Sequence, residues 1–265
     1  MGFGGIMRKL PIGIQDFEKL ITNQYLYIDK TELTHKLITS GTTYFLSRPR
    51  RFGKSLLIST LKAIFEGKKH LFKGLFIEKS DWKWEKHPVF RLDLNAKEFS
   101  TKQQLLELIG QDITRFAKHY NLEIPTLDIS GQFRFLIEEA HKQTGKKVAI
   151  LIDEYDKPLL STFQNKELNN EYRNILKGFY GVLKSADQDI QFSLLTGVTK
   201  FSQVSIFSDL NHLKDISMLK EYGTLCGLTQ SEIESQLEPE IALMAETEVQ
   251  SYDQTLEALK KWYNG

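Results

Sequence analysis

Short apolar runs alternate with longer amphipathic stretches along most of the chain. We interpret the apolar runs at residues 43–47, 89–94, 148–152 and 191–196 as strands. The stretches between them carry apolar side chains at helical spacing. This alternation is typical of a parallel sheet covered by helices, so the sequence predicts an α/β fold.

Residues 102–120 show the clearest helical pattern, because their apolar side chains recur at three- and four-residue spacing and form one apolar face. These side chains are Leu105, Leu106, Ile109, Ile113 and Phe116. Residues 132–144 and 169–186 are predicted to be helices by the same test. Residues 65–84 and 121–131 are rich in Gly, Pro and charge without a clean period, so we expect ordered insertions at the sheet edge.

The organisation changes near Thr229. Thr229 and Glu232 fit a capping box, in which the hydroxyl and the carboxylate satisfy the first backbone donors of a helix. We therefore divide the chain into a core of residues 1–225 and a helical region of residues 226–265. The chain closes on Trp262 and Tyr263 with little after them to pack on, so we expect the natural protein to continue and the helical region to be truncated.

Composition narrows the classes of partner. The chain has 35 basic and 34 acidic side chains, and this balance provides no global field for nucleic acid. Any such contact must be local or belong to another domain. The single cysteine, Cys226, cannot form an internal disulfide and is expected to be a buried structural thiol. The apolar run at residues 148–152 is far shorter than the roughly 20 residues that cross a bilayer, and the N-terminus lacks a leader pattern. We expect a cytoplasmic protein without a membrane segment.

A basic segment, Arg-Pro-Arg-Arg-Phe-Gly-Lys-Ser at residues 48–55, follows the first predicted strand and precedes an apolar helix at 56–65. This order predicts a phosphate-binding loop, because successive backbone N–H groups and a helix N-terminus favour an anion. Gly53 lets the backbone approach, Lys54 would bridge the β- and γ-phosphates, and Ser55 would offer its hydroxyl to magnesium. The alternative is a basic surface turn that contains Gly-Lys-Ser by chance.

The loop departs from the usual pattern, since Arg48 stands where the first glycine is expected. Pro49 removes one backbone donor, so anion contacts should fall on the later amides. We accordingly predict a nucleotide-binding set in and around this loop. Its members are Arg50, Arg51, Phe52, Gly53, Lys54, Ser55 and Leu56. Arg50 and Arg51 could equally be solvated charges.

A fully apolar strand ends in two adjacent acids, Asp153 and Glu154. Such a strand delivers both carboxylates to the carboxyl edge of the sheet, where ligands of open α/β folds bind. Asp153 would hold magnesium and Glu154 would polarise an attacking water, which favours hydrolysis over phosphate transfer. Alternatively, both acids are solvated turn residues. The segment at residues 165–168 lacks the Asp of a guanine-reading motif, so ATP is preferred over GTP.

Three further segments are interpreted from their positions. Thr196 closes the fourth predicted strand and is a candidate sensor of the γ-phosphate, the alternative being a Thr that only hydrogen-bonds a loop. Asp29 lies before the first strand, where an adenine-contacting segment could sit. Trp82 and Trp84 are interpreted as packing residues rather than as a base-stacking platform.

With these motifs, the chain resembles the bacterial AAA-ATPase-like family, whose members often carry a C-terminal nuclease-like domain of the PD-(D/E)XK type. The matching segments are residues 10–17, 28–31, 48–55, 151–158, 196–198 and 207–211. The resemblance implies that Arg48 is the family's own variant of the loop. It also implies a P-loop NTPase core of the additional-strand (AAA/ASCE) type, with the sensor strand beside the phosphate-loop strand and a small C-terminal helical lid. Nuclease activity is not carried over to these residues.

The resulting hypothesis is an ATP-binding and ATP-hydrolysing domain that acts as a motor or switch. Its partner would be nucleic acid or protein, engaged through a further C-terminal domain, and a homo-oligomer is left open. The alternative is a nucleotide-dependent scaffold with very slow turnover. None of the eight arginines follows Arg173, so the lid is predicted to lack an arginine contact to the γ-phosphate. Arg50, Arg51, a lid lysine such as Lys214 or Lys220, or a neighbouring subunit would supply that charge.

Overall fold

The computed structural model describes residues 8–94, 100–199, 207 and 210–264. Its centre is a five-stranded sheet in the order β2-β3-β4-β1-β5, in which every pairing is parallel. The strands are β1 (Thr43–Ser47), β2 (Val89–Asp93), β3 (Val148–Asp153), β4 (Ile190–Gly197) and β5 (Lys214–Asp215). The four predicted strands are confirmed, each to within one residue at its ends. β5 is too short to leave a pattern in the sequence.

The position of β4 decides the fold class. β4 lies between β1 and β3, with Leu46 opposite Thr196 on one side and Ile152 opposite Leu195 on the other. One strand is therefore inserted between the strand that enters the phosphate loop and the strand that ends in the acids. This is the additional-strand arrangement of P-loop NTPases, and it brings the carboxyl ends of β1, β4 and β3 side by side.

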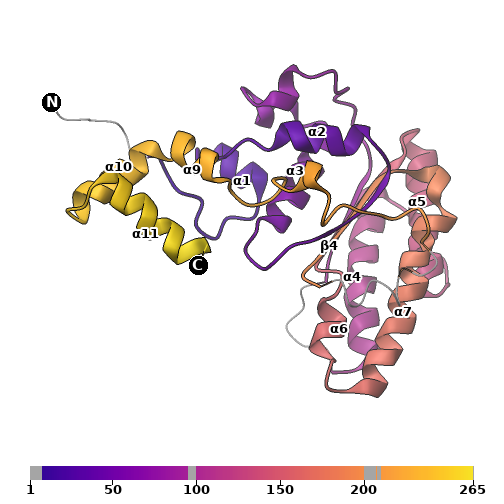
Figure 1. Cartoon of the computed structure of the whole chain (residues 1–265). Helices are drawn as coiled ribbons and strands as arrows, with labels where there is room; N and C mark the ends of the chain where they lie inside the picture. Colours follow the sequence, from indigo (N-terminus) through magenta and orange to yellow (C-terminus); the bar gives the residue numbers. More distant parts are fainter. Residues whose placement is uncertain (1–7, 95–99, 200–206, 208–209, 265) are drawn as a thin grey trace.

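Helices cover both faces of the sheet (Figure 1). Side chains of alternating direction on each strand divide between two cores, so that Phe45 faces one core while its neighbours Tyr44 and Leu46 face the other. One face is covered by α4 (Lys102–Tyr120), α5 (Ile129–Thr144) and α7 (Lys166–Ser185). The other is covered by α1 (Phe17–Thr22), α2 (Thr31–Thr39), α3 (Lys54–Phe65), η1 (Lys69–Phe72) and η2 (Phe76–Lys79).

Two helices begin before the apolar pattern starts, at Ile129 instead of residue 132 and at Lys166 instead of residue 169. Their N-caps explain the difference, because Asp128 accepts a hydrogen bond from the backbone N of Gly131 at 2.8 Å and Asn165 does so from Leu168 at 3.1 Å. The N-cap residues determine where these two helices begin, and hydrophobic periodicity does not detect N-caps.

Residues 65–84 were expected to be an insertion at the sheet edge, and this is wrong. Their two short 3₁₀ helices, η1 and η2, pack against α1, α2 and α3 over one face of the sheet. As predicted, Trp82 and Trp84 are packing residues, with ring centroids 5.7 Å from Phe65 and 5.0 Å from Phe72, respectively. The aromatic content of this segment, which its lack of period concealed, explains its place in the core.

The C-terminal region is helical, with α9 (Gln230–Gln236), α10 (Glu238–Thr247) and α11 (Tyr252–Asn264). The predicted capping box is present, with Thr229 accepting from the backbone N of Glu232 and Glu232 accepting from that of Thr229. These helices make up the region predicted to be a lid, here called the lid region, and they lie at the end of the molecule opposite α4, α5 and α7 (Figure 1). Within the described part of the chain, no helix combines the length and the apolar character needed to span a membrane.

Candidate functional site

The loop between β1 and α3 has the backbone form that an anion site requires. Gly53 is the N-cap of α3 and has a φ of 87°, while Arg51 has a φ of 66°, so two positions adopt the left-handed region. A Cβ built on Gly53 would meet nothing within 4 Å, which means that conformation and not space favours glycine there. Alternation of right- and left-handed residues turns successive N–H groups into one concavity. The first turn of α3 adds its own free amides.

Lys54 opens α3 and folds back across this loop. Its ammonium donates to the backbone carbonyls of Arg48 and Pro49, each at 3.0 Å, and only 5% of the residue is exposed. The amine therefore lies inside the loop. A phosphate bound in the concavity would meet this charge directly.

Arg48 has a structural use that its place in the motif did not reveal. Its guanidinium donates to the carbonyls of Ser217, at 2.5 Å, and Tyr222, at 3.2 Å. Its backbone N donates to the carbonyl of Gly197 at 3.1 Å. The Arg48 side chain thus ties the start of the loop to the segment after β5. Because the guanidinium bonds that segment, an arginine is accommodated where a glycine is usual.

The lid lysines proposed from the sequence are not in the lid. Lys214 lies in β5 and Lys220 in η4 (Lys220–Tyr222), both before α9. Lys214 is 3.9 Å from Glu221. These two lysines belong to the edge of the core, so the hypothesis that a lid lysine replaces a lid arginine is wrong for both. Both lysines also precede residue 226, where the predicted helical region begins, and the two-residue strand β5 left no strand signal in the sequence.

The acid pair and the candidate sensor meet at the carboxyl edge of the sheet. Asp153 is the last residue of β3 and is 2% exposed, and its Oδ1 accepts a hydrogen bond from Thr196 Oγ1 at 2.7 Å. Thr196 is fully buried on β4. The predicted neighbourhood of these two residues is therefore present, although a sensing role for Thr196 stays a prediction.

Glu154 leaves β3 with a φ of 53°, in the left-handed region that a side chain rarely adopts. Burial raises the pKa of its carboxyl above the usual value, and the negative charge of Asp153 adds to the rise. Lys157 and Lys54 act in the opposite direction. A carboxylate with a raised pKa is a stronger base, which suits a group that polarises water.

A cavity of about 340 Å³ adjoins the loop. The N-terminal segment forms one wall, the phosphate loop and α3 a second, and the turn that enters the lid a third. Residues from each wall are Tyr27, Ile28 and Lys30, then Phe52, Gly53 and Leu56, then Cys226, Gly227 and Leu228. The wall is mostly apolar, as a nucleobase site is.

Asp29, the predicted adenine-side contact, turns away from this cavity. Its carboxylate accepts from the backbone N and the hydroxyl of Thr31, at 2.8 and 2.7 Å, and from the backbone N of Phe76 at 2.8 Å. Its neighbours Ile28 and Lys30 line the cavity instead. A contact between Asp29 and nucleotide stays a prediction, and Asp29 visibly holds the segment that carries those neighbours.

Cys226 is buried, as expected from the sequence, and lies in the cavity wall. Burial raises the pKa of its thiol to about 11. At neutral pH the side chain is a thiol and not a nucleophilic thiolate, so its contribution to this wall is apolar contact.

Two ion pairs join the N-terminal segment to the lid beside the cavity. Lys30 lies 2.5 Å from Glu232 of α9, and Arg8 lies 2.5 Å from Glu240 of α10. Lys30 and Glu232 are 202 positions apart in the chain. Sequence reasoning missed these pairs, because local patterns carry no signal for contacts between distant charges.

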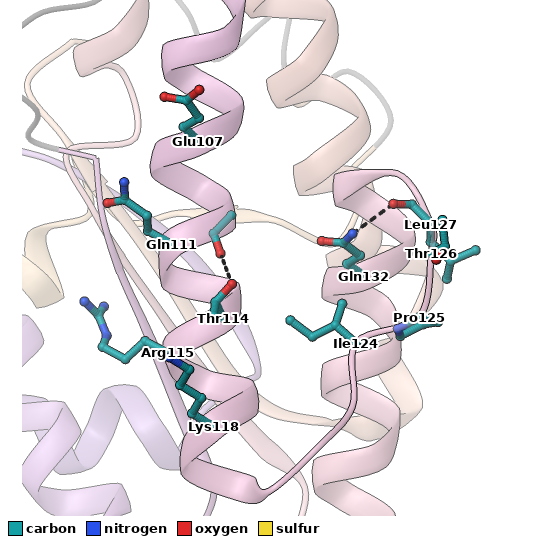
Figure 2. A pocket seen from close by; sticks show the side chains of 11 residues that line it. Glu107, Gln111, Thr114, Arg115, Lys118, Ile124, Pro125, Thr126, Leu127 and Gln132 are labelled. Carbon is teal, nitrogen blue, oxygen red and sulfur yellow. Dashed lines mark hydrogen bonds between the residues drawn. The ribbon is translucent and has the colours of Figure 1, made fainter.

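A larger cavity of about 870 Å³ lies elsewhere, between α4 and the segment that leads into α5 (Figure 2). Its lining mixes charged and polar side chains with apolar ones, and Arg115 in this lining pairs with Asp112 at 2.6 Å. None of the site residues predicted from the sequence lines it. The smaller cavity beside the phosphate loop is therefore the candidate site.

Comparison with known proteins gives a family match, a curated relative and a similar solved structure. The family model described as "Predicted AAA-ATPase" matches residues 11–207. An uncharacterised protein in the vnfD 5′ region of Azotobacter chroococcum mcd 1 is 39% identical over 260 residues, which cover 97% of this chain and 48% of that protein. The chain thus spans about half the length of this curated relative. Among solved structures, the Aeropyrum pernix ORC2 protein, in ADPNP-ADP complexes, matches with a TM-score of 0.40 and 14% identity, over 98% of this chain and 71% of that one. Of the segments that carry the family resemblance, Ser208 and Asp209 lie outside the described residues.

Proposed function

We propose that this chain, which belongs to the predicted AAA-ATPase family, binds ATP with magnesium and hydrolyses it. The proposal rests on one observation: the phosphate loop, the candidate sensor and the acid pair lie together at the carboxyl edge of the sheet. The phosphate loop follows β1, Thr196 closes β4, and the acids Asp153 and Glu154 follow β3, with Thr196 bonded to Asp153 at 2.7 Å.

In this proposal the triphosphate occupies the loop between β1 and α3. Backbone amides from Phe52 to Leu56 would bind its oxygens, and Lys54 would supply the charge for the β- and γ-phosphates. Arg50 and Arg51 are candidates for further phosphate contacts. The base would enter the apolar cavity between Tyr27 and Cys226.

The residues present fit magnesium. The Ser55 hydroxyl at the start of α3 and the Asp153 carboxylate at the end of β3 are oxygen donors, the type that Mg²⁺ prefers. When bound, the ion would neutralise charge on the phosphates. Glu154 would orient water and take its proton, a role that its raised pKa supports. Thr196 would hold Asp153 in place.

A motor or switch that acts on nucleic acid or a partner protein is the role we favour for such a domain, with a homo-oligomer as one way to supply an arginine. One feature supports slow turnover: residues 174–265 contain no arginine, so α9, α10 and α11 have none to offer the γ-phosphate. A scaffold that binds ATP and turns it over very slowly is therefore the second candidate.

The test measures ATP affinity and phosphate release on the same protein, with and without magnesium and with added DNA or RNA. Magnesium-dependent release that Glu154→Gln removes supports an ATPase. Tight ATP binding without release in any condition favours the scaffold. Absence of ATP binding would sink both.

A further inference from the structure

We propose that Asp156 is a positioning residue for hydrolysis, which holds residues 196–199 so that Thr196 stays hydrogen-bonded to Asp153. The inference rests on the proposed ATPase activity and adds a residue to it. Asp156 follows the acid pair by two positions, and from sequence alone it could pass for a second base or for a surface turn residue.

The contacts of Asp156 show what its carboxylate does. The residue is 1% exposed, and its Oδ2 accepts from the backbone N of Val198 at 3.1 Å, the backbone N of Thr199 at 2.7 Å and the Thr199 hydroxyl at 2.9 Å. Its Oδ1 also faces the backbone N of Val198, at 3.3 Å. All of these partners are donors, which an ionised carboxylate satisfies best. A buried carboxylate needs such partners because it has left water.

The same contacts argue against a role as the base. A general base needs an oxygen that reaches the proton it abstracts. Both carboxylate oxygens of Asp156 accept hydrogen bonds from Val198 and Thr199. Among the hydrogen bonds of the described residues, none involves the carboxylate of Glu154. The chemistry is therefore left to Glu154, and Asp156 acts through the segment that it holds.

The held segment is fixed from two sides. Tyr155 donates from its hydroxyl to the carbonyl of Thr199 and from its backbone N to the carbonyl of Thr196, both at 2.9 Å. From the other side, Ser47 Oγ donates to the carbonyl of Val198 at 3.0 Å. Residues 196–199 thus connect the strand that ends in the acids with the strand that enters the phosphate loop.

Gly197 shows how closely these parts fit. A Cβ on this residue would lie 2.4 Å from the Tyr155 ring and 2.8 Å from Asp156 Oδ1, and both of these residues are buried. The segment therefore lies directly on Tyr155 and Asp156. Release of the carboxylate contacts would free the backbone immediately after Thr196, whose Oγ1 is 2.7 Å from Asp153 Oδ1.

Nucleotide binding should be less sensitive than hydrolysis to this release. The phosphate loop, α3 and the walls of the cavity are built from other segments. Asp156→Asn keeps the side-chain size but replaces one acceptor oxygen by an amide that faces backbone donors. We expect turnover to fall about 10- to 100-fold, the usual range for partners that orient a metal ligand, while ATP affinity measured without magnesium is kept, because Asp153 acts on binding only through the ion.

The experiment compares ATP affinity, single-turnover hydrolysis and hydrogen exchange of the peptide that contains residues 196–199. Asp156→Asn should slow hydrolysis and speed exchange in that peptide. Thr199→Val should behave alike, and Thr199→Ser, which keeps the donor, should restore the wild-type rate. Asp189→Asn is the matched control, because this buried acid bonds His141 at 2.7 Å at the opposite edge of the sheet.

Each outcome bears on one claim. If the wild type hydrolyses ATP and Asp156→Asn matches its rate, the positioning role is overturned and the ATPase stands. Equal loss of magnesium-free ATP binding and of turnover in Asp156→Asn and Thr199→Val would also overturn it, since the residue would then only support the fold. Should Asp156→Asn fail to fold, the Thr199→Val and Thr199→Ser pair decides. A wild type that binds ATP without hydrolysis overturns the inference together with the ATPase.

Discussion

At the scale of single residues, Lys54 tests the phosphate loop most directly. We expect Lys54→Met to abolish ATP binding and leave the fold intact, because methionine keeps the buried stem and removes the charge that the phosphates need. Alanine would be a poorer choice, since Lys54 is only 5% exposed and truncation would leave a gap. Titration calorimetry and a thermal melt measure the two effects.

Lys62→Met is the matched control for this variant. Lys62 lies on the same helix, α3, with 38% of its side chain exposed and its amine 3.2 Å from Glu66. It should bind ATP as the wild type does. A folded Lys54→Met protein with unchanged ATP affinity would remove the phosphate loop from the proposal.

Substitutions of Asp153 and Glu154 should differ in their effects on ATP affinity and on turnover. Asp153→Asn should weaken magnesium-dependent ATP binding and hydrolysis together, because the ion's charge stabilises both bound states. Glu154→Gln should lower turnover by roughly 10²-fold or more with affinity kept, because a general base acts on the transition state. Nucleotide affinity and single-turnover rates of both variants check this. Wild-type turnover in Glu154→Gln would exclude Glu154 as the base.

The raised pKa of Glu154 predicts how turnover depends on pH. A base must be deprotonated, so the rate should rise as pH increases through the raised pKa and then reach a plateau. The midpoint should lie above about 4.3, the ordinary value for glutamate, because burial, and then the charge of Asp153, disfavour the charged carboxylate. The pH profile of kcat/KM gives this midpoint, because kcat/KM reports the pKa values of the enzyme before magnesium and ATP bind, whereas a bound ion would add its own charge. A midpoint at or below the ordinary value would contradict the assignment.

At the scale of elements, Gly197 tests the junction of β4 with the segment after β3. Gly197→Ala places a Cβ 2.4 Å from the Tyr155 ring, so we expect a loss of about 1 to 3 kcal/mol in the free energy of unfolding, as overpacked cores show. Gly181→Ala on α7 is the control, because its Cβ would meet nothing within 4 Å. It should be neutral or stabilising. Chemical denaturation of both variants measures the difference, and equal stabilities would contradict the tight fit.

The elements themselves were largely predictable, since a strand buried on both faces is a continuous apolar run and a helix on a sheet is amphipathic. β3 and α4 illustrate the two cases. Prediction failed where other forces set the structure. Asp128 starts α5 through a cap, and residues 65–84 enter the core through aromatic packing without a period.

At the scale of the whole molecule, the motif residues on neighbouring strands could be placed from the sequence, because parallel strands bring their carboxyl ends to one edge. Thr196 beside Asp153 is the result. Contacts across long chain separations could not be placed. The hydrogen bond from Arg48 to Ser217 spans 169 positions of the chain, and that from Lys30 to Glu232 spans 202. No local sequence pattern predicts either contact.

The pairing of Lys30 with Glu232 gives a prediction about the lid. Both carboxylate oxygens of Glu232 accept from Lys30, at 2.5 and 2.6 Å, and one of them also accepts from the backbone N of Thr229 at 2.8 Å, so Glu232 serves both the ion pair and the cap of α9. Lys30 lines the cavity beside the phosphate loop. A lid held by this pair should keep the third wall of the cavity in place.

Glu232→Gln separates the two roles, because glutamine supports a capping box but cannot form an ion pair. We expect α9 to stay folded while ATP affinity falls about two- to fivefold, the scale of a partly exposed pair. High salt should weaken ATP binding by the wild type more than by the variant, since screening acts on the pair. Glu234→Gln on the same helix is the control, as its partner is the neutral Gln230. Calorimetry at low and high salt measures the affinities, and a Glu232→Gln affinity equal to that of Glu234→Gln would show that the ion pair does not hold the lid over the nucleotide.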